Sequence, residues 1–139
     1  MSVANAAVAV LLRSPLHRVM SGSTDLIRYT GTRSGRTFVT PTQYVLDGDE
    51  LIIMAGRPET KSWWRNFVTP HDMDVLLGGK WMAMVGEAVV GGDQPEYAAR
   101  LLDAYLARYP RAARTLAGEA HAEQARRAVF VVCRPRSSP

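Results

Sequence analysis

The sequence has little cysteine, little lysine and no convincing membrane segment. Cys133 is the only cysteine among 139 residues, which excludes an internal disulfide framework and a cysteine-rich zinc site. A single thiol is typical of a reducing compartment, so we expect a cytoplasmic protein. The apolar stretch at residues 2–12 is too short to span a bilayer and lacks the basic leader of a signal peptide. We therefore expect no stable membrane insertion.

The sequence also lacks the usual patterns of metal and nucleophile chemistry. Its three histidines, His17, His71 and His121, lie far apart and share no short spacing with an acid or a thiol. No Gly-x-Ser-x-Gly segment is present, and Cys133 falls in a predicted strand without a neighbouring base. We therefore expect no metal site and no side chain that acts as a nucleophile.

The composition is that of one compact domain over residues 1–139, with 47% hydrophobic and 22% charged residues. The net charge is +4, and 15 of the 17 basic residues are arginine. The planar guanidinium group suits bidentate contacts to phosphate or carboxylate. The charge balance therefore fits an anionic small ligand at least as well as nucleic acid.

A basic stretch at residues 13–36 contains five arginines, opposed only by Asp25. Nucleic-acid binding would need aromatic side chains interleaved with these arginines as stacking platforms, and they are not interleaved. We expect no nucleic-acid partner.

Strands are expected at residues 24–31, 36–46, 50–55, 73–77, 80–90 and 128–133. Pro41 lies inside the second of these and indicates an edge strand or a bulge, because proline has no N–H to donate. Asp47-Gly48 and Gly78-Gly79 predict tight hairpin turns. The strand at 80–90 is apolar on both faces, so we expect it at the centre of the sheet, with Gly86 at a bulge.

Helices are expected at residues 3–12, 15–20, 61–68, 93–109 and 111–125. The segment 1–20 is expected to lie on the domain, with weak peripheral membrane contact left open. Thr60 or Ser62 would cap the helix at 61–68. Asp93 and Glu96 form a capping-box pattern around Pro95. Residues 135–139 are expected to be a frayed tail.

The order of these elements predicts an α+β domain. About six strands are joined by hairpin-length connections, with helices at the ends and in two insertions, so a parallel doubly wound sheet is not expected. Closing the strands into a small antiparallel barrel would remove the edges of the sheet.

The turn Gly31-Thr32-Arg33-Ser34-Gly35-Arg36 is the first candidate binding site. Its two glycines would let successive N–H groups point the same way and bind an anion, with Ser34 and the guanidinium groups of Arg33 and Arg36 as further donors. The alternative is an ordinary charged hairpin turn.

The second candidate is the segment Lys61-Ser62-Trp63-Trp64-Arg65-Asn66-Phe67. On a helix, Lys61 and Arg65 would share one face, where a bound anion would offset their mutual repulsion. Adjacent tryptophans point in different directions, so one of them is expected to line a cavity or the surface. The alternative is a tryptophan core anchor with a basic solvent face.

Four segments of the sequence, taken in order, resemble the deazaflavin-dependent nitroreductase family. They are Tyr29 to Arg36, Thr40-Pro41, Asp47-Gly48-Asp49 and Trp63-Trp64-Arg65-Asn66. The resemblance covers roughly residues 10–134. It implies a split β-barrel of the kind found in flavin reductases and pyridoxamine oxidases. It also implies hydride transfer from reduced coenzyme F-420 to an electron-poor small molecule such as a quinone, an enone or a nitro compound.

The resemblance further implies which residues contact the coenzyme, whose phospholactyl and polyglutamyl tail is strongly anionic. The phosphate would bind Arg33, Ser34 and Arg36, and the deazaflavin ring would lie beside Thr40 and Pro41. The segment with Lys61, Trp64 and Asn66 would border the same site.

Other expectations from the family stay open at this point. Phe38 stands where many members carry a second basic residue. Tyr44 and Tyr29 are candidate proton donors for the product, with water as the alternative. Flavin mononucleotide is the alternative cofactor. The alternative function is that of a non-catalytic or flavin mononucleotide-binding barrel that carries or sequesters an anionic cofactor. A homodimer is expected by analogy with related barrels.

Overall fold

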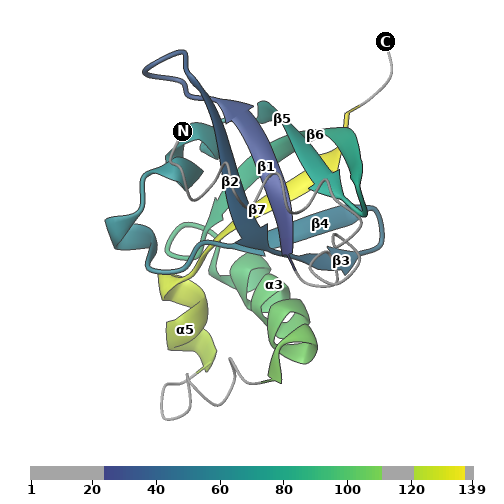
Figure 1. Cartoon of the computed structure of the whole chain (residues 1–139). Helices are drawn as coiled ribbons and strands as arrows, with labels where there is room; N and C mark the ends of the chain where they lie inside the picture. Colours follow the sequence, from purple (N-terminus) through teal and green to yellow (C-terminus); the bar gives the residue numbers. More distant parts are fainter. Residues whose placement is uncertain (1–23, 111–120, 137–139) are drawn as a thin grey trace.

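The computed structural model describes residues 24–110 and 121–136, and they form one curled antiparallel sheet with two helices on one side (Figure 1). The seven strands are β1 (Thr24–Thr30), β2 (Thr37–Gln43), β3 (Val45–Asp47), β4 (Glu50–Met54), β5 (His71–Leu77), β6 (Lys80–Val90) and β7 (Val129–Pro135). The helices are α3 (Pro95–Arg108) and α5 (His121–Arg127). Two short 3-10 helices, η1 (Pro58–Thr60) and η2 (Trp63–Phe67), connect β4 to β5.

The strand order explains how the sheet becomes a barrel. The strands lie in the order β2-β1-β5-β6-β7-β4-β3, so β2 and β3 are the two edges. These edges are consecutive in the chain and are separated by Tyr44 alone. Because one residue cannot cross a flat sheet of seven strands, the sheet must curl until its edges meet. The result is a split β-barrel, as predicted, with its seam at Tyr44.

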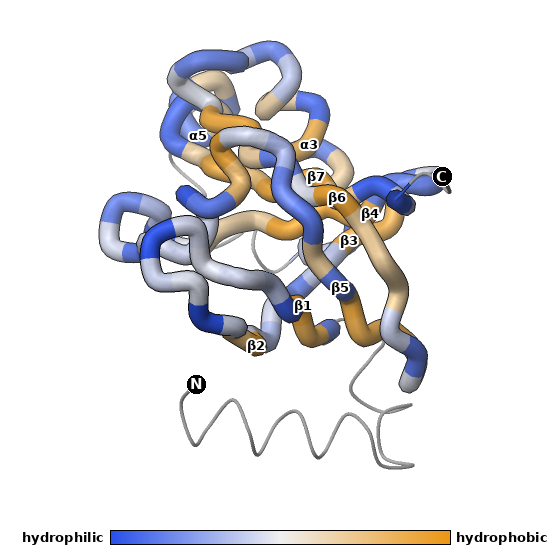
Figure 2. The backbone as a smooth tube through the Cα atoms, turned by 90° about the horizontal axis from the view of Figure 1, so that it is seen from above, coloured by the Kyte–Doolittle hydropathy of each residue, from blue (hydrophilic) through white to orange (hydrophobic). Residues whose placement is uncertain are grey.

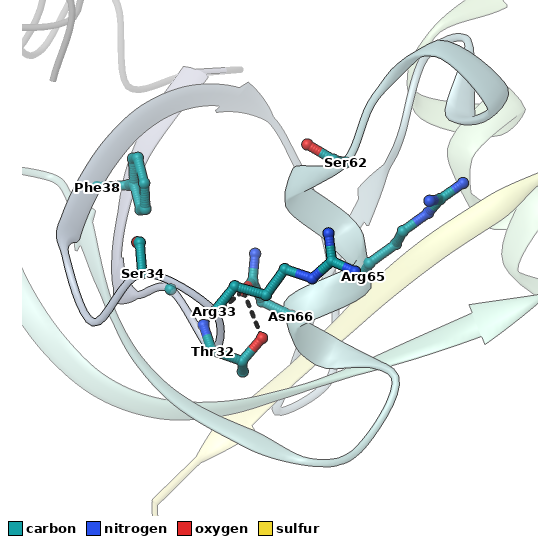
Figure 3. A pocket seen from close by; sticks show the side chains of 8 residues that line it. Thr32, Arg33, Ser34, Phe38, Ser62, Arg65 and Asn66 are labelled. Carbon is teal, nitrogen blue, oxygen red and sulfur yellow. Dashed lines mark hydrogen bonds between the residues drawn. The ribbon is translucent and has the colours of Figure 1, made fainter.

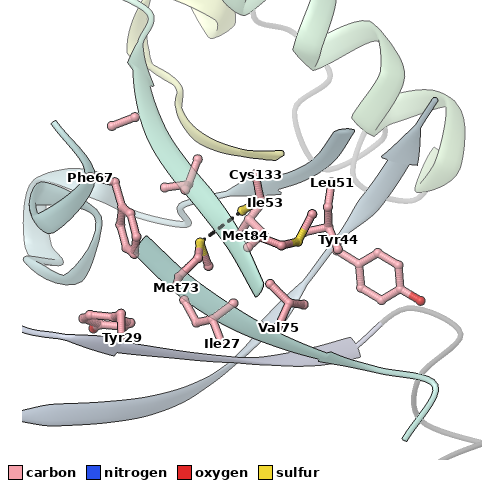
Figure 4. Close-up of a cluster of buried hydrophobic side chains, with 12 residues drawn as sticks. Ile27, Tyr29, Tyr44, Leu51, Ile53, Phe67, Met73, Val75, Met84 and Cys133 are labelled. Carbon is pink, nitrogen blue, oxygen red and sulfur yellow. Dashed lines mark hydrogen bonds between the residues drawn. The ribbon is translucent and has the colours of Figure 1, made fainter. Parts of the chain in front are cut away.

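The barrel has an apolar interior (Figure 4). Strands β4 and β7 contribute to it through alternate residues, because successive side chains of a strand point to opposite faces. The interior cluster consists of Ile27, Tyr29, Tyr44, Leu51, Ile53, Phe67, Met73, Val75, Met84, Ala88, Val131 and Cys133.

A second apolar layer lies between the outside of the barrel and the helices. The alternate residues of β4 and β7, including Ile52, Phe130 and Val132, pack there against Leu101 and Leu102 of α3. Strands β4 and β7 are therefore buried on both faces, and their positions are among the most hydrophobic in Figure 2. This double burial explains why both strands are nearly continuous apolar runs.

Most expected strands are confirmed, including the full length of β6 and its central place between β5 and β7. The count of six was wrong, because the expected strand at 36–46 is divided at Tyr44 into β2 and β3. Pro41 lies in β2, an edge strand. The Gly78-Gly79 turn is confirmed, with φ of 59° and 79°.

Two local expectations about turns and bulges were wrong. Asp47 pairs with Glu50, so Gly48 and Asp49 form the turn, and only Gly48 has a positive φ, of 61°. Gly86 is not at a bulge, because it pairs in register with β5 and β7. It is needed because a Cβ there would lie 2.7 Å from Met73 Sδ and 2.8 Å from Phe67 Cδ1.

The apolar pattern of β6 also overstated its burial, since Met82 is 38% exposed. Helix α3 lies within the expected range and has Pro95 in its first turn as expected, but Gln94 is its N-cap and makes no side-chain capping bond, so no capping box forms. Ser62 precedes η2 without a capping bond, and η2 is a 3-10 helix.

Strand β7 extends beyond the expected strand at residues 128–133. Pro135 ends β7, and the Arg136 N–H donates to the Ala83 carbonyl at 3.1 Å. The expected helices at 3–12 and 15–20, part of the helix at 111–125 and residues 137–139 lie outside the described residues. None of the helices in the described ranges has the length and hydropathy needed to cross a bilayer.

Candidate functional site

The turn between β1 and β2 is closed by its own hydrogen bonds. The Gly31 N–H donates to the Arg36 carbonyl at 2.8 Å, and the Gly35 N–H donates to the Gly31 carbonyl at 3.0 Å. The Arg36 N–H donates to Ser34 Oγ at 3.2 Å. The Ser34 hydroxyl is an acceptor in that bond, so its proton remains available to a ligand.

The two glycines of this turn have different roles. Gly35 has a φ of 69°, which a residue with a Cβ rarely adopts. Gly31 is required by a close approach, because a Cβ there would lie 2.8 Å from Phe38 Cε2. The turn therefore holds the Phe38 ring directly against its own backbone.

Helix η2 fixes the turn from a distant part of the chain. Asn66 Oδ1 accepts hydrogen bonds from the Thr32 N–H at 2.9 Å and from Thr32 Oγ1 at 3.1 Å. Asn66 Nδ2 donates to the Trp63 carbonyl at 2.8 Å, which orients the amide group. The two candidate segments of the sequence therefore form one site.

A pocket of about 350 Å³ lies between the turn and η2 (Figure 3). Figure 3 shows Arg33 extending across Asn66 toward η2, with Ser34 and Phe38 on the turn side of the pocket. The lining residues are Gly31, Thr32, Arg33, Ser34, Phe38, Ser62, Arg65 and Asn66. We call this the turn pocket.

The lining of the turn pocket favours an anion. It contains two arginines and no acidic residue. Among the described residues, no protein group accepts a hydrogen bond from the backbone N–H of Arg33 or of Ser34. The Arg65 guanidinium lies 5.5 Å from the centre of the Trp64 ring. Exposed guanidinium groups, amides and a hydroxyl are the donors that a phosphate or carboxylate needs.

Only some of the predicted cofactor residues line the turn pocket. Arg33, Ser34 and Asn66 line the turn pocket, whereas Arg36 ends the turn beside it. Thr40 and Pro41 lie on β2, where they pair with Ile27 and Leu26 of β1.

The other two predicted residues lie behind the pocket or beside it. Trp64 is half-buried against the barrel interior, and its Nε1 donates to the Pro58 carbonyl at 2.9 Å. Lys61 is exposed next to Ser62 but does not line the pocket. Trp64 therefore supports the segment, while Lys61 adds positive charge at its edge.

The two candidate proton donors lie at opposite ends of the barrel interior (Figure 4). Tyr29 stacks on Phe38 with a ring-centre distance of 5.7 Å, and burial raises its pKa above the usual value. Tyr44 lies at the seam and lines a different pocket, beside Arg108 of α3. Burial, then the nearby Asp25 and Tyr109, raise the pKa of Tyr44, and Arg108 opposes that shift.

The turn pocket adds Phe38 and Ser62 to the individual residues that were expected to bind a ligand. Arg65 lines the pocket, and its face was expected to bind an anion together with Lys61, although the resemblance did not imply that Arg65 contacts the coenzyme. Phe38 carried no such signal, because its place depends on the shape of the turn. Within the described parts of the chain, no group of three or more His, Cys, Asp or Glu side chains is positioned to hold a metal ion.

Solved structures with the same fold support the split-barrel assignment. An F420-H2 dependent reductase matches with a TM-score of 0.55 and 20% identity, over 79% of this chain and 93% of that chain. A domain-swapped dimer matches with a TM-score of 0.55 and 15% identity, over 91% and 98%. A putative 5-nitroimidazole antibiotic resistance protein from Bacteroides thetaiotaomicron matches with a TM-score of 0.51 and 10% identity, over 87% and 78%.

No curated protein matches this chain in sequence. The sequence pattern of one protein family does match it, over residues 13–119, which include the turn, η2 and most of the sheet. The resemblance seen in the turn, the strand proline and the tryptophan–asparagine segment is thereby confirmed, and the chain belongs to the F420H(2)-dependent quinone reductase family.

Proposed function

We propose that the turn pocket binds the anionic part of coenzyme F-420. The chain is an oxidoreductase of a family that uses this coenzyme in its reduced form to transfer a hydride to an electron-poor small molecule. The observation that supports the proposal is that Arg33 and Arg65 both line this pocket, whose lining contains no acidic residue.

The residues present fit such a group. A phosphate in the turn pocket would accept from the Arg33 and Ser34 amides, from the Ser34 hydroxyl and from one or both guanidinium groups. Asn66 Oδ1 would not contact the phosphate, because an amide oxygen only accepts hydrogen bonds and this one accepts from Thr32. We propose that Asn66 holds the turn in its binding conformation.

The barrel side of the pocket supplies an apolar wall. Phe38 lines the pocket and stacks on Tyr29. The Tyr29 ring in turn meets the Phe67 ring edge-on, with their ring centres 5.3 Å apart. We propose that these rings and the neighbouring Thr40 and Pro41 of β2 border the deazaflavin ring and keep water from it. The coenzyme itself supplies the hydride, and the protein binds and orients it.

Tyr29 is the better of the two proton-donor candidates. It packs against a residue of the turn pocket, whereas Tyr44 lines the pocket at the seam. We propose that Tyr29 or solvent gives the product its proton. A Tyr29→Phe variant that keeps coenzyme affinity and loses turnover would support Tyr29, and unchanged turnover would leave the proton to solvent.

A titration tests the assignment of the turn pocket. Oxidised coenzyme F-420 is added to the protein and to Arg33→Ala, and quenching of tryptophan fluorescence is followed, with flavin mononucleotide in parallel. The loss of a charge-assisted hydrogen bond is expected to raise the dissociation constant at least tenfold, an estimate of about 1.5–3 kcal/mol. Arg126→Ala on α5, whose arginine pairs with Glu123, is the matched control and should bind as the wild type does.

The titration has clear contrary outcomes. Unchanged affinity of Arg33→Ala would exclude the turn from the site. Tighter binding of flavin mononucleotide than of F-420 would leave the pocket in place and replace the cofactor. Far-ultraviolet circular dichroism of each variant shows whether the fold persists.

We also propose that the protein acts in the cytoplasm and forms a homodimer. A single thiol supports the first point, and one structural neighbour, a domain-swapped dimer, supports the second. Sedimentation equilibrium measures the mass in solution, and a monomer at micromolar concentration would exclude a stable dimer.

A further inference from the structure

The side chain of His71 holds the end of β1 at the point where the turn begins. His71 is the first residue of β5, and its Nε2 lies 2.7 Å from the Thr30 carbonyl oxygen. Thr30 is the last residue of β1 and directly precedes Gly31 of the turn. Because a carbonyl oxygen only accepts hydrogen bonds, the Nε2 atom must carry a proton and donate it. The contact therefore determines the tautomer, since a neutral His71 ring has its one proton on Nε2.

The turn is thus held from outside on both sides of Gly31. His71 bonds to Thr30 before the glycine, and Asn66 bonds to Thr32 after it. Glycine rotates about its backbone more freely than any other residue, so the chain could hinge at this position. The two backbone bonds that close the turn join only its own residues and would move with it. The bonds from His71 and Asn66 prevent such a hinge motion.

Both outside contacts come from one short stretch of the chain. Asn66 lies in η2 and His71 begins β5, five positions later. Arg33 and Ser34, which line the turn pocket, follow the held residues directly in the sequence. The direction of their backbone N–H groups therefore depends on how firmly the stretch at 66–71 holds the start of the turn.

The barrel core fixes the His71 ring in turn. The ring meets the Phe67 ring edge-on, with the ring centres 5.7 Å apart, and Phe67 is fully buried. Gly86 of β6 pairs with His71, and a Cβ on Gly86 would lie 2.8 Å from Phe67 Cδ1. Phe67 therefore fills the space that Gly86 leaves, and it cannot move without disturbing the core. His71 connects this rigid part of the barrel to the turn.

We propose that His71 is a positioning residue for the coenzyme, because its Nε2–H holds the turn so that the Arg33 and Ser34 amides point into the turn pocket. The proposal rests on the proposed function, in which this pocket binds the anionic part of F-420. His71 does not line the pocket and acts through the turn. The cationic ring also carries a proton on Nε2, so the bond does not depend on the charge of the ring.

Two variants separate the hydrogen bond of His71 from the packing of its ring. His71→Gln keeps an N–H donor at about the reach of Nε2 and removes the ring, whereas His71→Phe keeps a ring against Phe67 and removes the donor. Oxidised coenzyme F-420 is titrated into each variant, and the quenching of tryptophan fluorescence is followed.

We expect His71→Phe to raise the dissociation constant of F-420 about fivefold, since it loses one hydrogen bond, and His71→Gln to stay within about twofold of the wild type. His121→Phe on α5, whose histidine pairs with Asp103, is the matched control and should bind as the wild type does. Urea denaturation of each variant shows whether the protein is folded under the conditions of the titration.

The contrary outcomes are distinct. Wild-type affinity in His71→Phe would overturn the proposal. A loss in His71→Gln as large as that in His71→Phe would also overturn it, because the ring and not the donor would then be required. Absence of F-420 binding by the wild-type protein would refute the proposed function, and this proposal with it.

Nuclear magnetic resonance gives a result that needs no coenzyme. Long-range proton–nitrogen spectra of the imidazole groups should show the neutral His71 ring protonated at Nε2. A neutral ring protonated at Nδ1 would overturn the proposal, since it could not donate to Thr30. The backbone amide signals of Arg33 and Ser34 should shift in His71→Phe and stay near their wild-type positions in His71→Gln. Unchanged signals in His71→Phe would show that the turn does not need the bond.

Discussion

The buried carboxyl group of Asp25 makes the stability of this protein depend on pH. Asp25 is fully buried beside the seam of the barrel, where the Thr42 hydroxyl donates to its Oδ1. No described residue provides a hydrogen bond to Oδ2. Burial raises the pKa of Asp25 from 3.8 to about 7, although the bond from Thr42 acts in the opposite direction. The native protein therefore holds a proton here that the unfolded chain releases at a much lower pH.

The direction of the effect follows from proton uptake on folding. Between pH 4 and pH 7 the folded state binds one more proton than the unfolded state, so the free energy of unfolding falls as the pH rises. Each pH unit in this window costs about 1.4 kcal/mol. The two units between pH 5 and pH 7 therefore lower stability by about 3 kcal/mol, and no further loss from this group follows above pH 7.

Urea denaturation at pH 5 and pH 8 measures this change in the wild type and in Asp25→Asn. Asparagine keeps an acceptor for Thr42 and cannot ionise, so the variant should lack the loss of about 3 kcal/mol. Asp49→Asn, in the exposed hairpin turn, should retain the wild-type dependence. Equal changes in the wild type and in Asp25→Asn between the two pH values would refute the reasoning.

Three further predictions concern stability and binding. Gly91→Ala should lower the free energy of unfolding, measured by urea denaturation, by at least about 3 kcal/mol, because its Cβ would lie 1.8 Å from the Ala125 carbonyl oxygen. Gly92→Ala, whose Cβ would have its nearest contact at 3.8 Å, should lower it by less than about 1 kcal/mol, and equal losses in the two variants would contradict this prediction. Asn66→Ala should weaken F-420 binding about tenfold by releasing the turn, with little change in secondary structure by circular dichroism; unchanged affinity would remove its positioning role. Arg57→Gly should raise the unfolding free energy by about 1 kcal/mol, because Arg57 has a left-handed φ of 50°, and a loss of stability would show that the arginine makes stabilising contacts instead.

The local features of the fold could be predicted from the sequence because they depend on neighbouring residues. Gly78 and Gly79 predict their turn because both need a positive φ. Pro95 predicts the first turn of α3 because its missing N–H costs nothing there. The division at Tyr44 could not be predicted, because β2 and β3 separate only when each pairs with a different partner, β1 and β4.

The candidate site shows the same limit. The turn at residues 31–36 was apparent from its glycines, serine and arginines. The residues alone did not predict its contact with η2, because the bond between Thr32 and Asn66 joins residues 34 positions apart, and only the family resemblance implied that the two segments border one site. The left-handed backbone of Arg57 was not predicted either, since Gly56 is the residue at which a positive φ would be expected from sequence.

The position of Pro41 in β2 has a consequence for how two copies of this protein can meet. An edge strand offers its free N–H and carbonyl groups to any passing strand, and continuous ladders between molecules lead to aggregation. Proline has no donor to offer and its ring obstructs an incoming strand, so β2 is protected at its middle. A second copy is therefore expected to associate through side-chain surfaces, without extending the sheet at this edge.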